Sequence, residues 1–289
     1  MSATSLTWDG RSIPGPGGLP AVAVSLTGPS LAQARTQARS AIDAGADVLE
    51  LRVDLLEEAG ALAAPAPLDA AMAAAQVLEC LRGLREAIDT TDGADAGAPV
   101  LLTCRTAAEG GRAQLDDAAY GSLLRSVLDG LTDWTPERRP VAIDVEVQRG
   151  CLPQVCAQAH ALSIDVVASF HDFEATPADE VLEEVLARMA REGADLAKIA
   201  VWPTSAQDVA SLLGVCARAT AGAGEAAALG VPVAAMSMGA LGAVSRVAPA
   251  FGTALTFAVV PDEQGQARAS APGQLPIQDV RRCLELLRA

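Results

Sequence analysis

The chain alternates short aliphatic runs with longer stretches whose apolar residues recur every three to four positions. The short runs are typical of buried β-strands, and the longer stretches are typical of helices packed on one face. Strands are expected at residues 21–26, 47–53, 99–105, 141–147, 164–170, 195–201, 231–238 and 254–260. Helices are expected at residues 30–44, 68–88, 115–131, 152–161, 178–191, 206–218, 240–249 and 277–287. This alternation predicts a parallel sheet covered by helices.

Eight strand–helix units in roughly 250 residues match the size of a (β/α)8 TIM barrel. We therefore expect a single α/β barrel domain over residues 1–289, with an N-terminal arm at residues 1–20 and the barrel at residues 21–289. Residues 6–13 are expected to form a β-hairpin that turns at Asp9-Gly10 and caps the barrel floor. A doubly wound sheet is the alternative, but no glycine-rich dinucleotide fingerprint follows the first expected strand.

Two further segments are expected to be loops or insertions, because turn-forming residues are concentrated in them. Residues 60–67 are rich in Ala and Pro, and residues 90–98 are rich in Asp and Gly. Neither resembles a linker between domains. Together they lengthen the unit between the second and third expected strands.

Composition limits the partners of this fold. Hydrophobic residues make up 51% of the 289 residues but aromatic residues only 3%, so the core must consist mainly of Ala, Val and Leu. The formal net charge of −15 argues against nucleic acid and against an anionic membrane surface as partners. The longest uncharged stretch, residues 226–245, contains glycines and Pro232, and we expect a loop, a strand and a loop there instead of a membrane span.

The cysteine pattern points to neither metal binding nor disulfides. No C-x-x-C pair occurs and the chain has only two histidines, so we expect no zinc site and no other cofactor. The first residues lack the basic and apolar regions of a signal peptide, which leads us to expect a cytoplasmic protein with free thiols. The cysteines are Cys80, Cys104, Cys151, Cys156, Cys216 and Cys283.

Lys198 is the only lysine in the chain, and all the other residues among its 21 lysines and arginines are arginines. It lies within residues 195–201, where a strand buried on both faces is expected. A buried lysine can lose its proton and become a nucleophile, but arginine stays protonated. Survival of one lysine by chance is the alternative interpretation, and the buried context favours a chemical role.

Charged and polar residues interrupt several expected strands at alternate positions. Strand side chains alternate between inward and outward, and a charge facing the covering helices would be buried without a partner. These side chains should therefore point into the barrel, near its C-terminal mouth. Buried ion pairs that only fix strand register are the alternative, although such clusters often cost more free energy than they return. The set is Glu50, Arg52, Thr103, Arg105, Asp144, Glu146, His171 and Lys198.

Catalytic residues of TIM barrels come from the ends of several strands at the C-terminal face. The expected strand ends supply Ser25, Glu50, Arg52, Arg105, His171, Lys198 and Met238, and the loops after the last two strands supply Arg246, Ser270 and Gln274. His160 lies on an expected helix, and we interpret it as structural.

This set suits elimination of water through a lysine Schiff base. Only about one lysine in a few thousand is neutral at pH 7. Burial and neighbouring arginines lower the lysine pKa, whereas the inward carboxylates raise it. The iminium would act as an electron sink for removal of the adjacent proton. His171 is the natural base, with Glu109 orienting its imidazole. Arg52, Arg105 and Arg246 indicate a substrate that carries a carboxylate.

The local sequences around these residues form an ordered series along the chain. They are Val24-Ser25-Leu26, Glu50-Leu-Arg52-Val-Asp54, Thr103-Cys-Arg105-Thr-Ala-Ala-Glu109-Gly-Gly111, Asp144-Val-Glu146, Ser169-Phe-His171-Asp-Phe173-Glu-Ala-Thr-Pro177, Lys198-Ile-Ala-Val-Trp-Pro203, Met236-Ser-Met238-Gly-Ala-Leu-Gly-Ala-Val-Ser-Arg246 and Ala269-Ser270-Ala-Pro-Gly-Gln274. In this combination the chain closely resembles the type I 3-dehydroquinate dehydratases, the Schiff-base class of the shikimate pathway. The resemblance implies a (β/α)8 barrel with an N-terminal hairpin, usually a homodimer, that acts on 3-dehydroquinate.

The resemblance also implies roles for individual residues. Lys198 would attack the C3 ketone, and His171, paired with Glu109, would take a C2 proton and return it to the departing C1 hydroxyl. Arg246 would bind the substrate carboxylate. Glu50, Arg52, Arg105, Ser270 and Gln274 would hold hydroxyls and order the loops, with Ser25 and Met238 lining the pocket. Departures from the family pattern, such as Cys104, Phe170 and Trp202, remove no chemical group.

Two other functions stay open from the residues alone. A class I aldolase-like Schiff-base lyase acting on a sugar phosphate also needs a lone strand lysine, and Gly239 and Gly242 could contribute to its phosphate site. A non-catalytic barrel that binds a carboxylate ligand is the second. Water loss distinguishes the dehydratase from carbon–carbon cleavage by the first, and covalent trapping distinguishes it from the second.

Overall fold

The computed structural model describes residues 5–63, 68–89, 98–221, 229–261 and 267–288. Eight parallel strands within these residues follow the order β10-β3-β4-β5-β6-β7-β8-β9. They are β3 (Ala21–Leu26), β4 (Val48–Arg52), β5 (Val100–Thr103), β6 (Ala142–Glu146), β7 (Asp165–Asp172), β8 (Leu196–Val201), β9 (Val233–Ser237) and β10 (Leu255–Ala258). Each corresponds to an expected strand.

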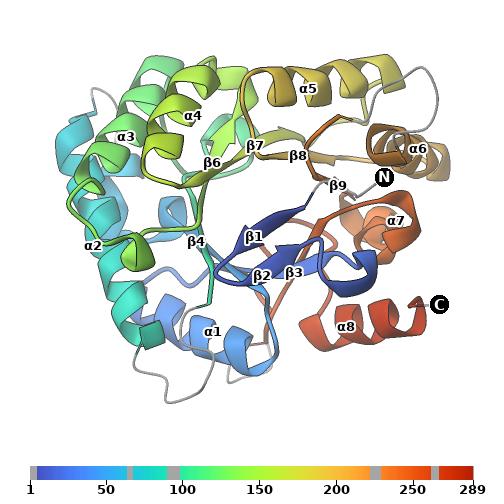
Figure 1. Cartoon of the computed structure of the whole chain (residues 1–289), viewed down its shortest axis with the longest axis horizontal. Coiled ribbons are helices and arrows are strands. Elements are labelled where there is room, and N and C mark those ends of the chain that lie inside the picture. Colours follow the sequence, from blue (N-terminus) through green and yellow to red (C-terminus); the bar gives the residue numbers. More distant parts are fainter. Residues whose placement is uncertain (1–4, 64–67, 90–97, 222–228, 262–266, 289) are drawn as a thin grey trace.

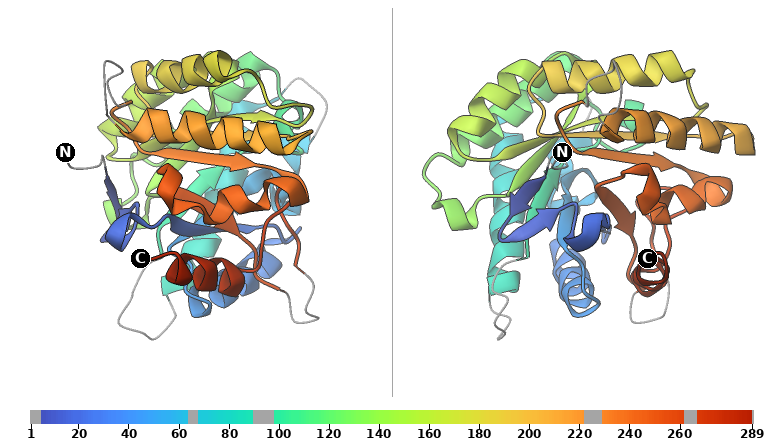
Figure 2. Two further views of the ribbon diagram at one scale, coloured as in Figure 1. Left: turned by 90° about the vertical axis from the view of Figure 1, so that its right-hand side faces the viewer. Right: turned by 45° about the vertical axis from the view of Figure 1, so that its right-hand side comes forward.

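Helices surround the strands on the outside (Figure 1), and the two views in Figure 2 show the same arrangement from other sides. They are α1 (Leu31–Asp43), α2 (Ala70–Asp89), α3 (Asp117–Gly130), α4 (Leu152–Ala161), α5 (Asp179–Arg191), α6 (Ala206–Ala221), α7 (Gly239–Gly242) and α8 (Ile277–Leu286). A parallel bridge between Val233 and Thr253 brings β9 beside β10 and nearly closes the sheet. The predicted (β/α)8 barrel is therefore confirmed.

One expected helix is much shorter than its pattern indicated. Residues 240–249 form the single turn α7, followed by a 3₁₀ helix at Ala243–Val247 and another at Pro249–Phe251. The Ser245 hydroxyl donates to the Gly242 carbonyl at 2.7 Å and accepts from the Ser237 amide at 2.9 Å. These local hydrogen bonds compete with the α-helical ladder, and Pro249 supplies no amide to continue it.

An N-terminal hairpin covers the barrel floor, as predicted. Its strands are β1 (Leu6–Trp8) and β2 (Arg11–Ile13), joined by Asp9 and Gly10, which both have positive φ (47° and 79°) as a tight type I′ turn requires. Trp8 and Ile13 are buried in the inner core, and the Trp8 indole donates to Asp165 Oδ2 at 2.8 Å. In Figure 1 the hairpin crosses the barrel opening.

The core has two apolar layers. The larger layer lies between the outward faces of the strands and the helices and includes Val22, Val24, Leu49 and Leu51. The smaller one fills the barrel above the hairpin with Ala21, Ala23, Val48, Leu101, Ala142, Val167, Leu196, Ala234, Met236, Ala254, Leu255 and Phe257. Aromatic side chains are rare in both layers, in agreement with the composition.

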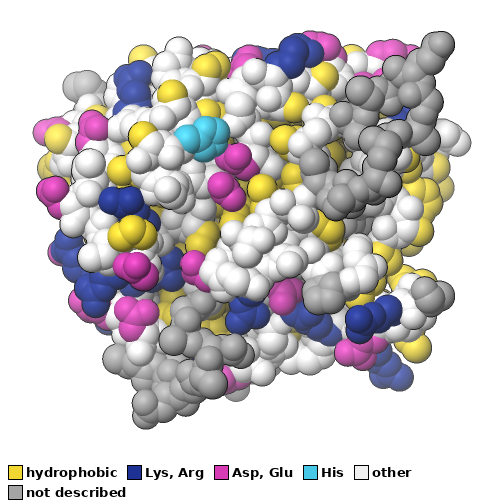
Figure 3. Space-filling model, in the orientation of Figure 1, with side chains coloured by type: hydrophobic (Ala, Val, Ile, Leu, Met, Phe, Trp, Pro, Cys, Tyr) yellow, Lys and Arg dark blue, Asp and Glu magenta, His cyan; other side chains and the backbone are white. Residues whose placement is uncertain are grey.

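The two expected loop segments fall largely outside the described residues, which omit 64–67 and 90–97. Residues Glu57–Ala63 form a 3₁₀ helix before the first of these gaps. No helix in the described ranges is long and apolar enough to cross a membrane. On the face shown in Figure 3, acidic and basic side chains are interspersed, so this face lacks the continuous basic surface of nucleic-acid-binding proteins.

Candidate active site

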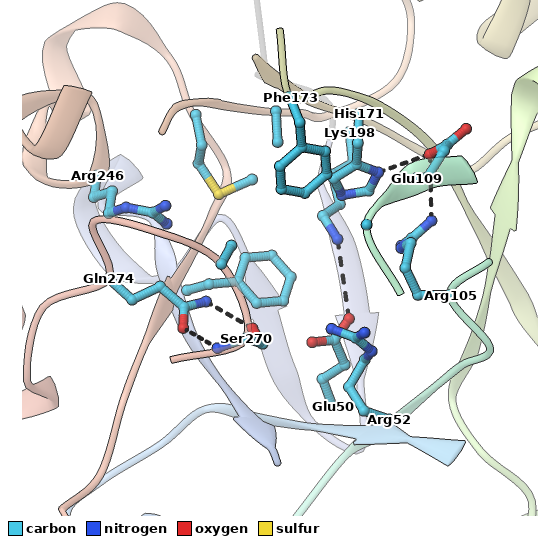
Figure 4. Close-up of a pocket in the computed structure, with 15 residues that line it drawn as sticks. Glu50, Arg52, Arg105, Glu109, His171, Phe173, Lys198, Arg246, Ser270 and Gln274 are labelled. Carbon is cyan, nitrogen blue, oxygen red and sulfur yellow. Dashed lines mark hydrogen bonds and ion pairs between the residues drawn. The ribbon is translucent and has the colours of Figure 1, made fainter. Parts of the chain in front are cut away.

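The inward faces of the strands change from apolar to charged along the barrel axis. On β4, Val48 belongs to the inner apolar core, whereas Glu50 and Arg52 follow at alternate positions toward the C-terminal end. On β8, Leu196 is likewise followed by Lys198. The charged residues surround a pocket at this end of the barrel (Figure 4). Its walls are Glu50, Arg52, Arg105, Glu109, Gly110, His171, Phe173, Lys198, Ala200, Met236, Arg246, Phe257, Ser270, Ala271 and Gln274.

Lys198 lies at the base of this pocket with only 5% of its surface exposed. Its Nζ is 3.6 Å from Asp144 Oδ2, 3.9 Å from Glu50 Oε1 and 4.5 Å from the centre of the Phe257 ring. Burial lowers the pKa of Lys198 below its ordinary value. Asp144 and Glu50 oppose this change, and the guanidinium groups of the neighbouring arginines add to it. The amine is therefore easier to deprotonate than a lysine in water.

His171 and Glu109 form a buried pair beside Lys198. His171 Nδ1 and Glu109 Oε2 share a hydrogen bond of 2.8 Å, and the Phe173 ring stacks on the imidazole at a centroid distance of 6.3 Å. Burial, reinforced by Arg105 and Lys198, holds the pKa of His171 well below 6.5. Burial also raises the pKa of Glu109 to about 8. The imidazole is thus neutral near pH 7 and able to accept a proton.

Arg105 connects the acidic groups of the pocket. Its guanidinium contacts Asp144 at 2.8 Å, Glu146 at 3.2 Å and Glu109 at 3.5 Å. Arg52 is held differently, because both oxygens of Asp54 accept from it at 2.8 Å. These two cations are already paired with carboxylates and are positioned rigidly.

Arg246 is the under-partnered cation of the pocket. It is 1% exposed, its Nη2 donates to the Pro272 carbonyl at 3.1 Å, and its Nε has no hydrogen-bond partner among the described residues. Burial lowers the pKa of this guanidinium to about 10. A buried guanidinium with an unused donor is a fitting partner for a planar anion such as a carboxylate.

The loop after β10 forms one wall. Ser270 donates from its hydroxyl to Ser25 Oγ at 2.8 Å, and its amide donates to Gln274 Oε1 at 2.9 Å. Gln274 Nε2 donates back to Ser270 Oγ at 2.9 Å. Ser25 also donates to Glu50, so it lies behind the pocket wall and supports two residues that line it.

Comparison with known proteins decides the family. Residues 22–289 match the model of the family described as Type I 3-dehydroquinase. The chain belongs to this family. A 3-dehydroquinate dehydratase of Klebsiella pneumoniae is 36% identical over 270 residues, covering 92% of each chain. That of Albidiferax ferrireducens is 34% identical over 294 residues, covering 100% of this chain and 96% of the relative.

Solved structures of 3-dehydroquinate dehydratases share the fold over nearly the whole chain. The enzyme from Geobacillus kaustophilus has a TM-score of 0.78 and 30% identity, with 98% of this chain and 96% of that chain covered. The type I enzyme from Clostridium difficile, solved with covalent modified comenic acid, has a TM-score of 0.79 and 29% identity, with 99% of both chains covered. Membership of the type I 3-dehydroquinase family favours the dehydratase over the aldolase-like and non-catalytic alternatives.

Two residues expected to line the pocket of this type I 3-dehydroquinase, Ser25 and Met238, are not among its lining residues, and Ser25 lies behind the wall, where it contacts Glu50 and Ser270. Met238 is fully buried at the start of α7 and is not among the lining residues, whereas Met236 is. The reason is that β9 ends at Ser237, so the alternation of inward and outward side chains ends there too. Met236, which pairs in register with Ala200, keeps the inward direction.

Several lining residues were missed by the sequence analysis. Strand alternation could have identified Ala200, Met236 and Phe257, because each lies on the inward face of its strand. Phe173 and Gly110 come from loops, where alternation gives no signal. Gly110 has a φ of +81°, and the Phe173 ring occupies the space where a side chain at this position would lie.

The remaining candidates for metal and thiol chemistry lie outside the pocket. No group of three or more His, Cys, Asp or Glu in the described ranges could hold a metal ion. All six cysteines have free thiols, and five of them are buried. His160 lies on α4 and shares a 2.8 Å hydrogen bond with Asp195, away from the lining residues.

Proposed function

We propose that Lys198 carries out the dehydratase reaction of this family by forming a Schiff base with 3-dehydroquinate. As a type I 3-dehydroquinase, the protein is a hydro-lyase of the shikimate pathway that converts 3-dehydroquinate into 3-dehydroshikimate and water. One observation carries the assignment of the nucleophile. The only lysine of the chain has its amine buried at the base of the pocket, where burial lowers its pKa.

The first stage makes the covalent intermediate. The neutral amine of Lys198 attacks the C3 carbonyl carbon, a carbon–nitrogen bond forms, and the former carbonyl oxygen leaves as water after it gains protons. The nitrogen ends as a protonated iminium. This group withdraws electrons from the neighbouring C2–H bond and weakens it.

The second stage removes water from the ring. The neutral imidazole of His171 accepts the C2 proton, and the released electron pair moves toward the iminium nitrogen. The same imidazolium then donates its proton to the C1 hydroxyl, which leaves as water on the same face. Glu109 holds Nδ1 of His171 and so leaves Nε2 for this proton transfer. Water finally hydrolyses the iminium and regenerates the amine.

Substrate orientation comes from the polar walls. Arg246 binds the carboxylate, because among the described residues that line the pocket its guanidinium is the cation with a buried donor that makes no hydrogen bond. Glu50, Arg52, Arg105, Ser270 and Gln274 hold the ring hydroxyls and order the surrounding loops, and Ser25 supports Glu50 and Ser270 from behind. Phe173, Met236 and Phe257 supply apolar surface that excludes water from the reacting nitrogen.

We also propose a homodimer in the cytoplasm that folds as a single barrel domain. The family resemblance supports the dimer. The six free thiols are in keeping with a reducing compartment.

Borohydride reduction tests the Schiff base. The protein is mixed with 3-dehydroquinate and reduced, and intact mass and peptide mass are measured. We expect one adduct, located on Lys198. An unchanged mass in the presence of substrate turnover would rule out covalent catalysis.

The matched variant is Lys198→Arg, which retains the positive charge but offers no nucleophilic amine. We expect turnover to fall by at least roughly 10⁴-fold and the adduct to disappear. Because the N-terminal amine is then the remaining primary amine, this variant also measures non-specific modification. Appreciable turnover by Lys198→Arg would contradict the assignment.

A further inference from the structure

One acidic side chain beside Lys198 has no part in the steps described above. Asp144, on the inward face of β6, is fully buried, and its Oδ2 is 3.6 Å from Lys198 Nζ. It is not among the residues that line the pocket. It therefore lies close enough to act on the reacting nitrogen but has no surface with which to bind substrate.

The Asp144 carboxylate is held at both oxygens. Its Oδ1 accepts from the Ser169 hydroxyl at 2.7 Å, and its Oδ2 accepts from Arg105 Nη2 at 2.8 Å. Burial by itself would raise the pKa of Asp144, but Arg105 and Lys198 together bring it below the ordinary value. The carboxylate is consequently a fixed negative charge at neutral pH.

Glu50 is the rival carboxylate, with its Oε1 3.9 Å from Lys198 Nζ. It accepts from Thr103 Oγ1 at 3.0 Å and from the Ser25 hydroxyl, and it lines the pocket. A bound substrate would therefore contact Glu50 and compete with Lys198 for the negative charge of this carboxylate. Asp144 lies outside the pocket wall, so its carboxylate has no surface that a bound substrate could contact.

Two arginines are the other charged groups that shift the pKa of Lys198 among the described residues, and Glu109 and Glu146 contact Arg105 in the same network. Arg52 extends from β4, Arg105 follows β5, and His171 extends from β7 with a neutral ring near pH 7. Phe257, on β10, presents its ring face to the amine. Without Asp144, the Lys198 ammonium and the Arg105 guanidinium would lie near each other with no shared anion between them.

We propose that Asp144 is the counter-ion of the reacting nitrogen, pairing with the Lys198 ammonium in the empty enzyme and with the protonated iminium in the covalent intermediate. The second half of this statement rests on the proposed Schiff-base mechanism. The nitrogen carries one positive charge as ammonium and as iminium, and none as free amine or enamine. Asp144 makes no bond and transfers no proton, and it favours the two charged forms.

Because the chain has one lysine, its side-chain nitrogen can be observed alone. Protein labelled with [¹⁵Nζ]lysine should give one Nζ signal, and its chemical shift against pH gives the titration midpoint of Lys198 without substrate. We expect the midpoint to fall by at least about one pH unit in Asp144→Asn. Ser169→Ala, which removes a neutral contact to the same carboxylate, should change it by much less. An unchanged midpoint in Asp144→Asn would overturn the proposal.

The comparison with Glu50→Gln keeps the test informative if circular dichroism shows that Asp144→Asn does not fold. Asp144 remains in that variant, so the midpoint should fall by less than about one pH unit. A larger fall would make Glu50 the counter-ion and overturn the assignment to Asp144.

The covalent form is tested by adding 3-dehydroquinate and following the same nitrogen. We expect a protonated iminium signal in the unaltered protein and deprotonation of that iminium at lower pH in Asp144→Asn. If Asp144 only held Arg105 in place, substrate affinity would weaken while both titrations stayed unchanged. Absence of any adduct in the unaltered protein would refute the Schiff-base mechanism, whereas the substrate-free titration would still decide the first half of the proposal.

Discussion

At the scale of single residues, burial is the main cause of the unusual acid–base behaviour in the pocket. The same desolvation lowers the pKa values of Lys198, His171 and Arg246 and raises that of Glu109. In each case the charged form loses hydration that the protein replaces only in part. A neutral base and an amine that deprotonates readily therefore arise from one physical cause, and their consequences can be tested separately.

Replacing Arg246 with Lys should mainly weaken substrate binding. Lysine keeps the charge but cannot present two parallel N–H donors to a carboxylate, so we expect KM to rise roughly 10- to 100-fold with kcat nearly unchanged. Steady-state kinetics on 3-dehydroquinate measures both constants. Arg268→Lys, an exposed arginine on the loop after β10, is the matched control. A fall in kcat alone would contradict the assignment of Arg246 to the carboxylate.

Glu109 should make the stability of the protein depend on pH. Its pKa is about 8 when folded and 4.5 in the absence of the fold, so between these values the folded chain holds a proton that the unfolded chain has lost. The contribution of Glu109 to stability is therefore greatest below pH 4.5 and is lost as pH rises toward 8. Urea unfolding should show Glu109→Gln gaining roughly 2–4 kcal/mol relative to the unaltered protein between pH 5 and pH 8.5.

The control for this measurement is Glu180→Gln, an exposed glutamate at the start of α5. Its stability difference from the unaltered protein should be nearly the same at both pH values. If the difference for Glu109→Gln were equally constant, the buried carboxyl would not be protonated in the folded state as described.

At the scale of elements, the inward faces of β4, β7 and β8 change in character along the strand. The inward residues near their N-terminal ends are apolar and belong to the same inner core as the hairpin, and the inward residues near their C-terminal ends include titratable residues that line the pocket. The hairpin closes the end that has no chemistry. Its Trp8 is 2% exposed and packs on the inner core, and the indole N–H of Trp8 donates a hydrogen bond to Asp165. Stability and catalysis should therefore be separable by substitutions in the hairpin.

Trp8→Ala should reduce the free energy of unfolding by about 3–5 kcal/mol, because it leaves a cavity and an unpartnered carboxylate at the floor. Trp8→Phe keeps an aromatic ring and loses the hydrogen bond to Asp165, so we expect a smaller loss of about 1–2 kcal/mol. Chemical denaturation measures both. At a temperature where both variants are folded, kcat/KM should match that of the unaltered protein. A parallel loss of kcat/KM would show that the floor influences the pocket.

At the scale of the whole molecule, the nearly closed barrel joins residues that are distant in sequence. β10 pairs with β3, and Ser270 contacts Ser25 although 245 positions separate them. The two ends of the chain thus complete one sheet and one pocket. For this reason we propose that residues 1–289 act as one cooperative domain.

Thermal or urea unfolding should then follow a single transition. Tryptophan fluorescence, which reports on Trp8 at the floor, on Trp134 beside Arg82 and on Trp202 packed against Gly239, should coincide with far-ultraviolet circular dichroism. For a homodimer the midpoint should rise with protein concentration. Two separated transitions would indicate that the barrel unfolds in parts.

The amino-acid sequence is sufficient to predict the order of strands and helices, the hairpin turn and the charged inward faces. These features follow from periods of 2 and 3.6 residues and from the dihedral angles of Asp9-Gly10, which are local properties of the chain. It also indicated the nucleophile, because a lone lysine in an apolar strand can be recognised without any partner. The pairing of His171 with Glu109 was expected from the need to orient the imidazole and from the family resemblance, and the two side chains share a 2.8 Å hydrogen bond.

By contrast, the set of residues that share the pocket, and the pKa shifts of those that titrate abnormally, can be obtained only from the folded structure. Because β9 ends at Ser237, Met236 lines the pocket and Met238 does not. Gly110 and Phe173 also line it, but they lie in loops, where the sequence has no period that could identify them. The fixed position of Asp144 beneath Lys198 depends on Arg105 and Ser169, which come from other parts of the chain. Distances between strands, hydrogen-bond partners and loss of hydration arise only when the barrel closes, because each depends on atoms that are remote along the chain.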